Sequence, residues 1–310
     1  MDKSFETEYV DLRRGAVQAS QNGGQNITPH AKLARPETTA GRQRILMCPP
    51  EHFGVDYVIN PWMQAHVGKA VHELAQSQWA HLHRQLSAHA EIEAVMPEAG
   101  LPDMVFTANA GLVIGNVAVV SRFRHPERAP EERLFRGWFL HNGFAIAPWP
   151  EEVSFEGAGD ALLDPGRPLI WCGYGFRSSE KAPSVLEKIF SRRSIGLRLI
   201  DPRFYHLDTC FCPLTGGWLM HFPPAFDTRS QEIIASLVPP SKRIEVDEKD
   251  AERFACNAVE LEGRIIMNGS SEALQNRLRA AGFLPVTTPL SEFIRAGGAA
   301  KCLTLKLADA

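Results

Sequence analysis

Short apolar runs alternate with stretches of helical spacing along the chain, from about residue 44 to its end. Residues 44–48 predict a buried strand, and residues 65–89 have the spacing of an amphipathic helix. Residues 105–120 predict two strands joined at Gly115 and Asn116, a dipeptide typical of hairpin turns. A helix over residues 128–140 follows, with two glutamates that suit a helix N-terminus.

The same order of elements then recurs. The predicted strand pairs are 155–163 with 168–172, 205–213 with 218–222, and 256–261 with 264–268; the predicted helices are 179–192, 227–237 and 271–281; and the predicted closing strands are 197–200, 243–246 and 284–287. This repeat of strand pair, helix and strand is about fifty residues long, a period that favours a solenoid or a propeller. A helix in every unit argues against an all-β propeller. A doubly wound α/β fold is the alternative, weakened because no glycine-rich phosphate loop follows a strand.

Composition limits the class of protein. Residues 1–42 are polar and predict a flexible N-terminal extension, so residues 43–310 form one predicted catalytic domain. The net charge of -3 gives no reason to expect a nucleic-acid or anionic-membrane partner. Six cysteines without a secretory segment or an apolar run of membrane-spanning length predict free thiols and a cytoplasmic location. Cys210 and Cys212 lack the usual zinc spacing, and we interpret them as strand cysteines.

The candidate chemistry begins at Cys302. A run of small residues, 296–300, leads into this cysteine, and Leu303, Leu305 and Leu307 then alternate with polar residues as in a strand. Glycines without a Cβ let the backbone approach a ligand closely. We therefore predict a flexible run before a nucleophilic thiol. The alternative is a buried core cysteine at the start of a terminal strand.

Residues with polar or reactive side chains recur with the fifty-residue period. Asn109, Glu156, His206, Asn257 and Cys302 each lie at or near the start of a predicted strand pair. Equivalent positions in a ring of units point toward a common axis, so these side chains are expected to converge. Polar groups buried together cost several kcal/mol unless a ligand or another polar group satisfies them. Convergence therefore predicts a binding site.

Each candidate also has a structural interpretation. Glu156, between apolar residues and glycines, fits a surface turn, and His206 in its aromatic setting fits a structural histidine. Arg128 fits a solvated basic loop. His206 and Asp208, two residues apart, would face the same side of a strand, which suits a base and a carboxylate that share one ligand.

These residues carry a family resemblance. Cys302 after its small-residue run, the motif His206-Leu-Asp208, and Glu156-Gly-Ala-Gly-Asp160 resemble the guanidino-group-modifying superfamily of arginine deiminases, dimethylarginine dimethylaminohydrolases and amidinotransferases. The similarity covers about residues 44–307. It implies a five-fold pseudosymmetric α/β propeller of strand-strand-helix-strand units, in agreement with the repeat.

Within the superfamily, the stretches 46–50, 60–63, 101–112 and 155–162 are most similar to the bacterial arginine dihydrolase branch. Deiminases carry an aspartate where this chain has Asn109. Dimethylarginine hydrolases usually lack the carboxylate that this chain has as Asp208. In the dihydrolase family a cyclodeaminase-like domain can follow the catalytic one, and we expect none here.

The resemblance implies a role for each residue. Cys302 would be the nucleophile and His206 the general acid and base. Glu156 and Asp208 would grip the guanidinium, and Asn109 would contact its terminal nitrogens. The further implied contacts with substrate are Arg128 to the α-carboxylate, Asn60 to the amino-acid end, Phe106 to the guanidinium plane, and Asp160 indirectly through Glu156.

The implied activity is hydrolysis of free L-arginine through a covalent thiouronium, giving ornithine, carbon dioxide and two ammonia without cofactor or metal. The alternatives are a deiminase that stops at citrulline, a dimethylarginine hydrolase, an amidinotransferase and a non-catalytic arginine-binding protein. A small molecule is the expected partner, and the chain is a candidate homo-oligomer.

Overall fold

The computed structural model of this chain describes residues 42–307. The predicted N-terminal extension lies outside the described residues except for Arg42.

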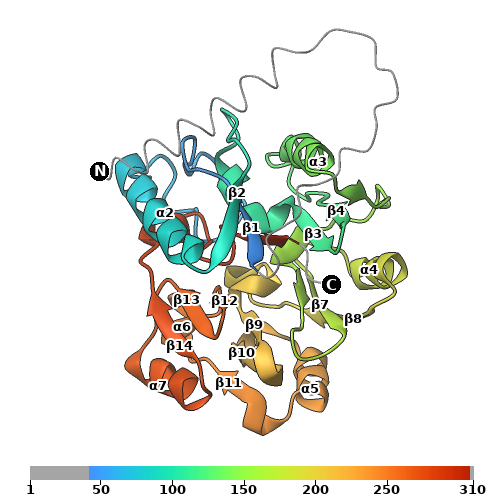
Figure 1. Cartoon of the computed structure of the whole chain (residues 1–310), viewed down its shortest axis with the longest axis vertical. Coiled ribbons are helices and arrows are strands. Elements are labelled where there is room, and N and C mark those ends of the chain that lie inside the picture. The colour runs from blue at the N-terminus through green and yellow to red at the C-terminus, as the bar shows by residue number, and fades with distance from the viewer. Residues whose placement is uncertain (1–41, 308–310) are drawn as a thin grey trace. The chain divides into compact units, whose positions relative to one another are not determined.

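Five three-stranded sheets make up the described chain (Figure 1). In every sheet the middle strand pairs antiparallel with one neighbour and parallel with the other. The sheets are β15 (Leu305–Leu307), β1 (Gln43–Met47) and β2 (Ala90–Ala94); β3 (Gly111–Ile114), β4 (Val117–Val120) and β5 (Ala145–Ile146); β6 (Ala161–Leu163), β7 (Leu169–Tyr174) and β8 (Arg193–Arg198); β9 (Phe211–Leu214), β10 (Trp218–His221) and β11 (Arg243–Glu245); and β12 (Val259–Leu261), β13 (Arg264–Met267) and β14 (Leu284–Thr287).

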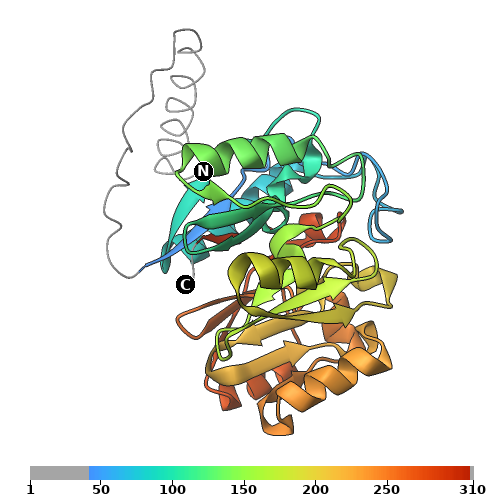
Figure 2. The same cartoon turned by 90° about the vertical axis from the view of Figure 1, so that its right-hand side faces the viewer.

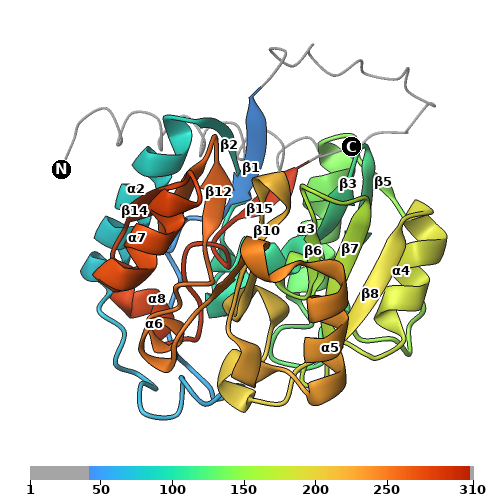
Figure 3. The same cartoon turned by 90° about the horizontal axis from the view of Figure 1, so that it is seen from below.

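One helix connects the two parallel strands of each sheet. These helices are α2 (His72–Ser87), α3 (Glu131–His141), α4 (Ala182–Phe190), α5 (Thr228–Leu237) and α7 (Glu272–Ala280). Figure 2 shows α3 in green and α4 in yellow-green, each lying along the strands of its own sheet. Figure 3 shows the helices outside and the strands toward the middle. Within residues 42–307, no helix has both the length and the apolar character that crossing a membrane requires.

The repeat predicted from the sequence is confirmed, and the doubly wound alternative is wrong, because five separate sheets replace one large sheet. The hairpin at Gly115-Asn116 and the predicted pairing of residues 256–261 with 264–268 are confirmed by the pairing of β3 with β4 and of β12 with β13. Three helices begin three or more residues later than predicted. The helix predicted from residue 65 begins at His72, after turns that end near Gly68, whose φ of 69° is left-handed. The helices predicted from residues 128 and 179 begin only at Glu131 and Ala182.

Hydrogen bonds between short turns link the five sheets in a closed circle. The Ala108 amide donates to the Cys302 carbonyl at 3.1 Å, and the Lys301 amide donates to the Asn257 carbonyl at 3.2 Å. The other three links are Asn109 Nδ2 to the Glu156 carbonyl, the Leu207 amide to Asp160 Oδ1, and Asn257 Nδ2 to the Asp208 carbonyl. Each turn thus fixes the next, and the last sheet is tied to the first.

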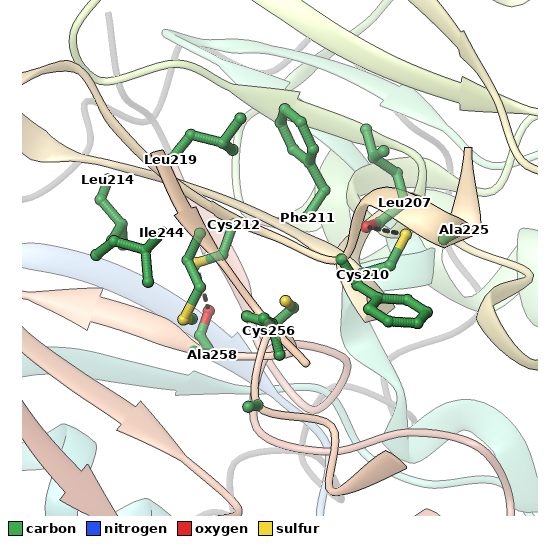
Figure 4. Packing of buried hydrophobic residues seen from close by; sticks show 14 of the residues in the cluster. Leu207, Cys210, Phe211, Cys212, Leu214, Leu219, Ala225, Ile244, Cys256 and Ala258 are labelled. Carbon is green, nitrogen blue, oxygen red and sulfur yellow. Dashed lines mark hydrogen bonds between the residues drawn. The ribbon is translucent and has the colours of Figure 1, made fainter. Parts of the chain in front are cut away.

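The apolar core of one half of the fold contains three cysteines (Figure 4). The thiol of Cys210 donates to the Leu207 carbonyl at 3.6 Å, and that of Cys212 donates to the Ala258 carbonyl at 3.7 Å. Burial raises the pKa of Cys210, Cys212 and Cys256 above the ordinary thiol range. They therefore pack as small apolar side chains. The strand interpretation is confirmed for Cys212, which lies in β9, and is wrong for Cys210, which lies in the turn just before that strand.

Candidate active site

The candidate residues sit in the turns that precede the first strand of each sheet. Asn109 lies in the 3-10 turn η2 (Thr107–Ala110) before β3, and Glu156 precedes η3 (Gly157–Gly159) before β6. His206 precedes η5 (Leu207–Thr209) before β9. Gly157 has a φ of 61°, and a Cβ there would lie 2.7 Å from the Ala108 carbonyl oxygen. Only glycine allows these two turns to pack this closely.

Cys302 lies in a turn, not in the predicted strand, which begins only at Leu305. Thr304, predicted on the strand face opposite the leucines, is buried, and its hydroxyl donates back to the Ala300 and Lys301 carbonyls. The Cys302 Sγ accepts from Asn257 Nδ2 at 3.1 Å and lies 3.4 Å from Asp208 Oδ2. Burial and the nearby Asp208 raise the pKa of the Cys302 thiol well above its ordinary value.

The run of small residues before Cys302 is a buried, bonded segment and not the flexible one predicted. Residues 296–300 are all buried. The hydroxyl of Tyr205 donates to the Gly297 carbonyl at 2.9 Å, and the Ala299 amide donates to Asn257 Oδ1 at 3.0 Å. A Cβ at Gly298 would lie 2.5 Å from the Phe106 ring. The glycines are therefore required by the packing of the protein itself against this run.

His206 is bonded to Glu156 behind the cavity. Its Nε2 lies 2.7 Å from Glu156 Oε2, which also accepts from Arg177 Nη1 at 2.8 Å. The other oxygen, Oε1, accepts from the Arg124 amide at 3.2 Å. Burial alone would raise the pKa of Glu156, but Arg177 and His206 hold it well below its usual range. Glu156 is thus an ionised partner that orients His206.

This geometry changes one expectation and narrows another. His206 and Asp208 lie in a turn, so they do not share one strand face; His206 contacts Glu156 while Asp208 contacts Cys302. Glu156 already uses three of the roughly four acceptor positions of a carboxylate. Its contact with a guanidinium remains a prediction.

Asp160 reaches Glu156 through one serine. Ser178 Oγ donates to Asp160 Oδ2 at 2.6 Å and accepts from the Glu156 amide at 3.0 Å. Asp160 Oδ1 accepts from the Leu207 amide at 3.0 Å. Burial raises the pKa of Asp160 to about 6. The geometry fits the predicted indirect support, since Asp160 positions both Glu156 and the turn that carries His206.

Asn109 is held from two sides. Its Oδ1 accepts from Arg128 Nη1 at 2.8 Å, and its Nδ2 donates to the Glu156 carbonyl at 3.0 Å. Arg128 in turn donates twice to Glu131, at 2.9 and 2.8 Å, and once to the Asp103 carbonyl. Arg128 is therefore a buried, ion-paired residue and not part of a solvated loop.

A cavity opens between these turns. Its lining residues are Ile59, Asn60, Met63, Asp103, Phe106, Asn109, Arg128, Arg177, Tyr205, His206, Ala296, Gly298 and Cys302. Six of the nine predicted site residues are among them. Of the other three, Glu156 and Asp208 lie behind the wall in contact with His206 and Cys302, which line it. Asp160 is bonded to Leu207 and Ser178, which do not line the cavity.

Asn60 and Phe106 also line the cavity. Asn60 Nδ2 donates to the Ala296 carbonyl at 3.0 Å, and its Oδ1 accepts from the Trp62 and Met63 amides. Asn60 thus ties the loop around residue 60 to the run before Cys302.

Sequence reasoning missed two charged residues of the cavity. Arg177 is buried, donates to Glu156 and to the Ile59 carbonyl, and lies 4.5 Å over the Tyr205 ring. Asp103 is buried as well; its Oδ2 accepts from the Tyr57 hydroxyl, whereas its Oδ1 has no hydrogen-bond partner. Arg177 does not lie at a position that recurs with the fifty-residue period, and only such positions indicated candidate residues in the sequence. Asp103 lies six residues before Asn109, inside a stretch that carried the resemblance.

Comparisons with known proteins agree with this geometry. A family model described as N,N dimethylarginine dimethylhydrolase, eukaryotic, matches residues 49–308. The N(G),N(G)-dimethylarginine dimethylaminohydrolase of Mycobacterium tuberculosis is 39% identical over 279 residues, which cover 89% of this chain and 90% of that protein.

The chain belongs to this family. The bifunctional arginine dihydrolase/ornithine cyclodeaminase ArgZ of Synechocystis sp. is 53% identical over 266 residues, 86% of this chain. The chain spans 38% of the length of ArgZ and of the similar AgrE of Nostoc sp..

Solved structures show the same fold. The N-terminal domain of ArgZ, a Cys-to-Ser variant bound to substrate, superposes with a TM-score of 0.85 at 52% identity, covering 86% of this chain and 98% of that domain. A dimethylarginine dimethylaminohydrolase adduct matches at a TM-score of 0.71 and 19% identity, which bears on the fold alone. The five-unit α/β architecture is therefore that of the superfamily.

Proposed function

We propose that this chain hydrolyses the guanidino group of free L-arginine through a covalent adduct on Cys302, giving ornithine, carbon dioxide and two ammonia. The observation that carries the proposal is the arrangement at the cavity. Cys302, His206 and Asn109 line it together, with Asp208 against the thiol and Glu156 against the histidine.

The relatives support this assignment of residues. Structures of the ArgZ N-terminal domain include a Cys-to-Ser variant bound to substrate and an Asn-to-Ser variant covalently bonded to a reaction intermediate. The asparagine and cysteine substituted there are separated by the same number of residues as Asn109 and Cys302.

The cavity suits the amino-acid end of arginine. Arg128 and Arg177 present buried cations that complement an α-carboxylate, and guanidinium groups bind carboxylates through paired bonds. Asp103 Oδ1 is a buried acceptor without a partner, which complements an α-ammonium group. Leaving such a group unsatisfied costs about 1–3 kcal/mol, so a bound ammonium would recover part of this cost. A free amino acid satisfies both ends.

The first round releases ammonia. The buried thiol gains its negative charge when the cationic guanidinium binds beside it, because a nearby cation favours the thiolate. Asp208, 3.4 Å from the sulfur, would accept N–H bonds from a guanidinium whose carbon faces Cys302. The sulfur bonds to that carbon, His206 protonates the departing nitrogen, and ammonia leaves. His206 then takes a proton from water, which attacks the adduct and frees the thiol and citrulline.

The second round acts on citrulline, whose ureido oxygen is an acceptor. An asparagine can offer N–H donors to that oxygen, whereas an aspartate cannot. The Asn109 amide is fixed in one orientation, with Oδ1 toward Arg128 and Nδ2 toward the Glu156 carbonyl. Nδ2 carries a second N–H, which we assign to the ureido oxygen. An aspartate would place an acceptor against that oxygen.

Product analysis on arginine tests the proposal. Purified chain is incubated with arginine, and citrulline, ornithine and ammonia are resolved over time, with Cys302→Ser as the control. We expect about two ammonia per ornithine and little free citrulline. Stable citrulline without ornithine would overturn the dihydrolase assignment in favour of a deiminase. Asn109→Asp should shift the products toward citrulline, and unchanged ornithine output would contradict the role given to Asn109.

A dimethylarginine hydrolase is the second candidate, because the family model and the mycobacterial relative carry that name. Parallel assays with arginine and asymmetric dimethylarginine separate the two, since only the second substrate would release dimethylamine. Products that change with an added amine would indicate an amidinotransferase. Arginine binding by the intact chain without turnover would indicate a non-catalytic binding protein. The cytoplasmic location and the homo-oligomer predicted from the sequence remain proposals.

A further inference from the structure

Glu131 does not line the cavity, yet it fixes one of the residues that do. It is the first residue of α3 and is fully buried. Its two oxygens accept from Nε and Nη2 of Arg128 at 2.9 and 2.8 Å, a paired geometry that holds the planar guanidinium in one orientation. Arg128 also lies 4.5 Å over the Phe123 ring. The guanidinium is therefore restrained at its edge and on its face.

Arg128 in turn determines how the Asn109 amide is oriented. An arginine is only a donor, so the atom of Asn109 that faces Nη1 must be Oδ1. A backbone carbonyl is only an acceptor, so the atom that faces the Glu156 oxygen must be Nδ2. Rotating the amide by half a turn would place donor against donor and acceptor against acceptor. The second N–H of Nδ2 thus has one fixed direction as long as Arg128 stays in place.

We infer that Glu131 is a positioning residue for the second hydrolysis: by holding Arg128, it fixes the Asn109 amide and thereby the N–H that binds citrulline. This inference rests on the proposed function. With a loosened Arg128, the Oδ1 of Asn109 loses its fixed partner and the amide samples both orientations. The donor to the ureido oxygen is then present for only part of the time.

The effect should be selective between two substrates. Arginine and citrulline have identical amino and carboxylate groups and differ only where a guanidinium is replaced by a ureido group. Loss of α-carboxylate binding by Arg128 would weaken both substrates equally. Loss of the oriented Asn109 donor would weaken citrulline, because only citrulline has an acceptor at this position. The ratio of the two kcat/KM values therefore separates a role through Asn109 from a role in carboxylate binding.

The test uses Glu131→Gln, which retains one acceptor oxygen but places an NH2 group against the N–H groups of Arg128. The matched control is Asp164→Asn. Asp164 is also buried and holds an arginine three residues along, Arg167 at 2.9 Å, but neither residue lines the cavity. We expect Glu131→Gln to lower kcat/KM for citrulline about three- to tenfold more than for arginine, the range of one net hydrogen bond. The control should leave the ratio unchanged.

A second comparison asks whether the effect passes through Asn109. In an Asn109→Ala background, adding Glu131→Gln should not change the citrulline-to-arginine ratio further. Equal losses for both substrates in Glu131→Gln, or a full additional change in that background, would overturn the inference. A wild-type chain that produces no ornithine would overturn both the proposed function and this inference. If Glu131→Gln does not fold, Glu131→Asp, which retains the charge but shortens the reach to Arg128, is measured in the same way with the same criteria.

Discussion

Replacing Asp208 by asparagine should stabilise the protein at neutral pH while removing activity. Asp208 is fully buried, and burial raises the pKa of its carboxyl to about 6 against the opposing effects of Lys301, Cys302 and Asn257. An aspartate in an unfolded chain titrates near a pKa of about 3.9. The folded protein therefore binds this proton more tightly than the unfolded chain does.

The sign of the pH dependence follows from that difference. Asp208 contributes its full stability below about pH 4 and loses it as the pH rises through about 6. The pKa difference of about two, at about 1.36 kcal/mol each, amounts to about 3 kcal/mol. Asp208→Asn does not titrate, so its advantage over the wild type should grow by about this amount between pH 4 and pH 8. Asp160 titrates in the same range but is present in both proteins and cancels.

Urea unfolding at a series of pH values measures the effect, with the m-value as a check on two-state behaviour. The control is Asp201→Asn. Burial would raise the pKa of Asp201, but the bonds from Arg203 outweigh it and lower the pKa, so this variant should lose stability at neutral pH and recover it in acid. A stability difference for Asp208→Asn that is constant from pH 4 to 8, or that favours the wild type as the pH rises, would refute the reasoning.

Three further predictions concern the cavity. Arg177→Met leaves the buried Glu156 carboxylate without its cation and should lower the free energy of unfolding by about 3–5 kcal/mol, measured in urea; an equal loss in a Glu156→Gln background would contradict this. Gly159→Ala places a Cβ 2.4 Å from Asn109 Nδ2 and 3.3 Å from the His206 ring. Displacement of these two side chains should lower kcat/KM for arginine at least about tenfold. Gly269→Ala, with open space around its Cβ, is its control. Alkylation of Cys302 by iodoacetamide should be slow at pH 7, accelerate as the pH rises because burial and a neighbouring carboxylate raise the pKa of its thiol, and be slowed by arginine. A rate that does not depend on pH would contradict a protonated resting thiol.

Local signals in the sequence predict the parts of the fold that local chemistry determines. The hairpin at Gly115-Asn116 is an example, because a left-handed glycine closes it without any distant contact. Strands β2 and β5 were not predicted. They are short and largely not fully buried, and their place is set by parallel pairing with β1 and β4, far away in the sequence.

The site residues also divide into those that the sequence pattern predicts and those that only the folded chain shows. The period finds Asn109, His206 and Cys302, because residues at equivalent positions of a repeat meet in space. It cannot find Arg177, which reaches the cavity from beyond β7. Two glutamates at the start of α3 suit a helix N-terminus in sequence, and only the folded chain shows that Glu131 instead pairs with Arg128. Charge pairing of this kind depends on tertiary distance, which spacing along the chain does not encode.

The antiparallel pairing of β15 with β1 determines when the first sheet can be completed during synthesis. The ribosome delivers the cavity residues Asn109 and His206 before the nucleophile Cys302, which precedes β15 by a short turn. Until β15 arrives, one edge of β1 lacks its partner and presents unpaired amide and carbonyl groups. A nascent chain thus has no Cys302 thiol in the site before the strands β1 to β14 have been synthesised. Chains truncated before residue 302 would be inert toward arginine and would carry an exposed strand edge that chaperones or proteases can engage.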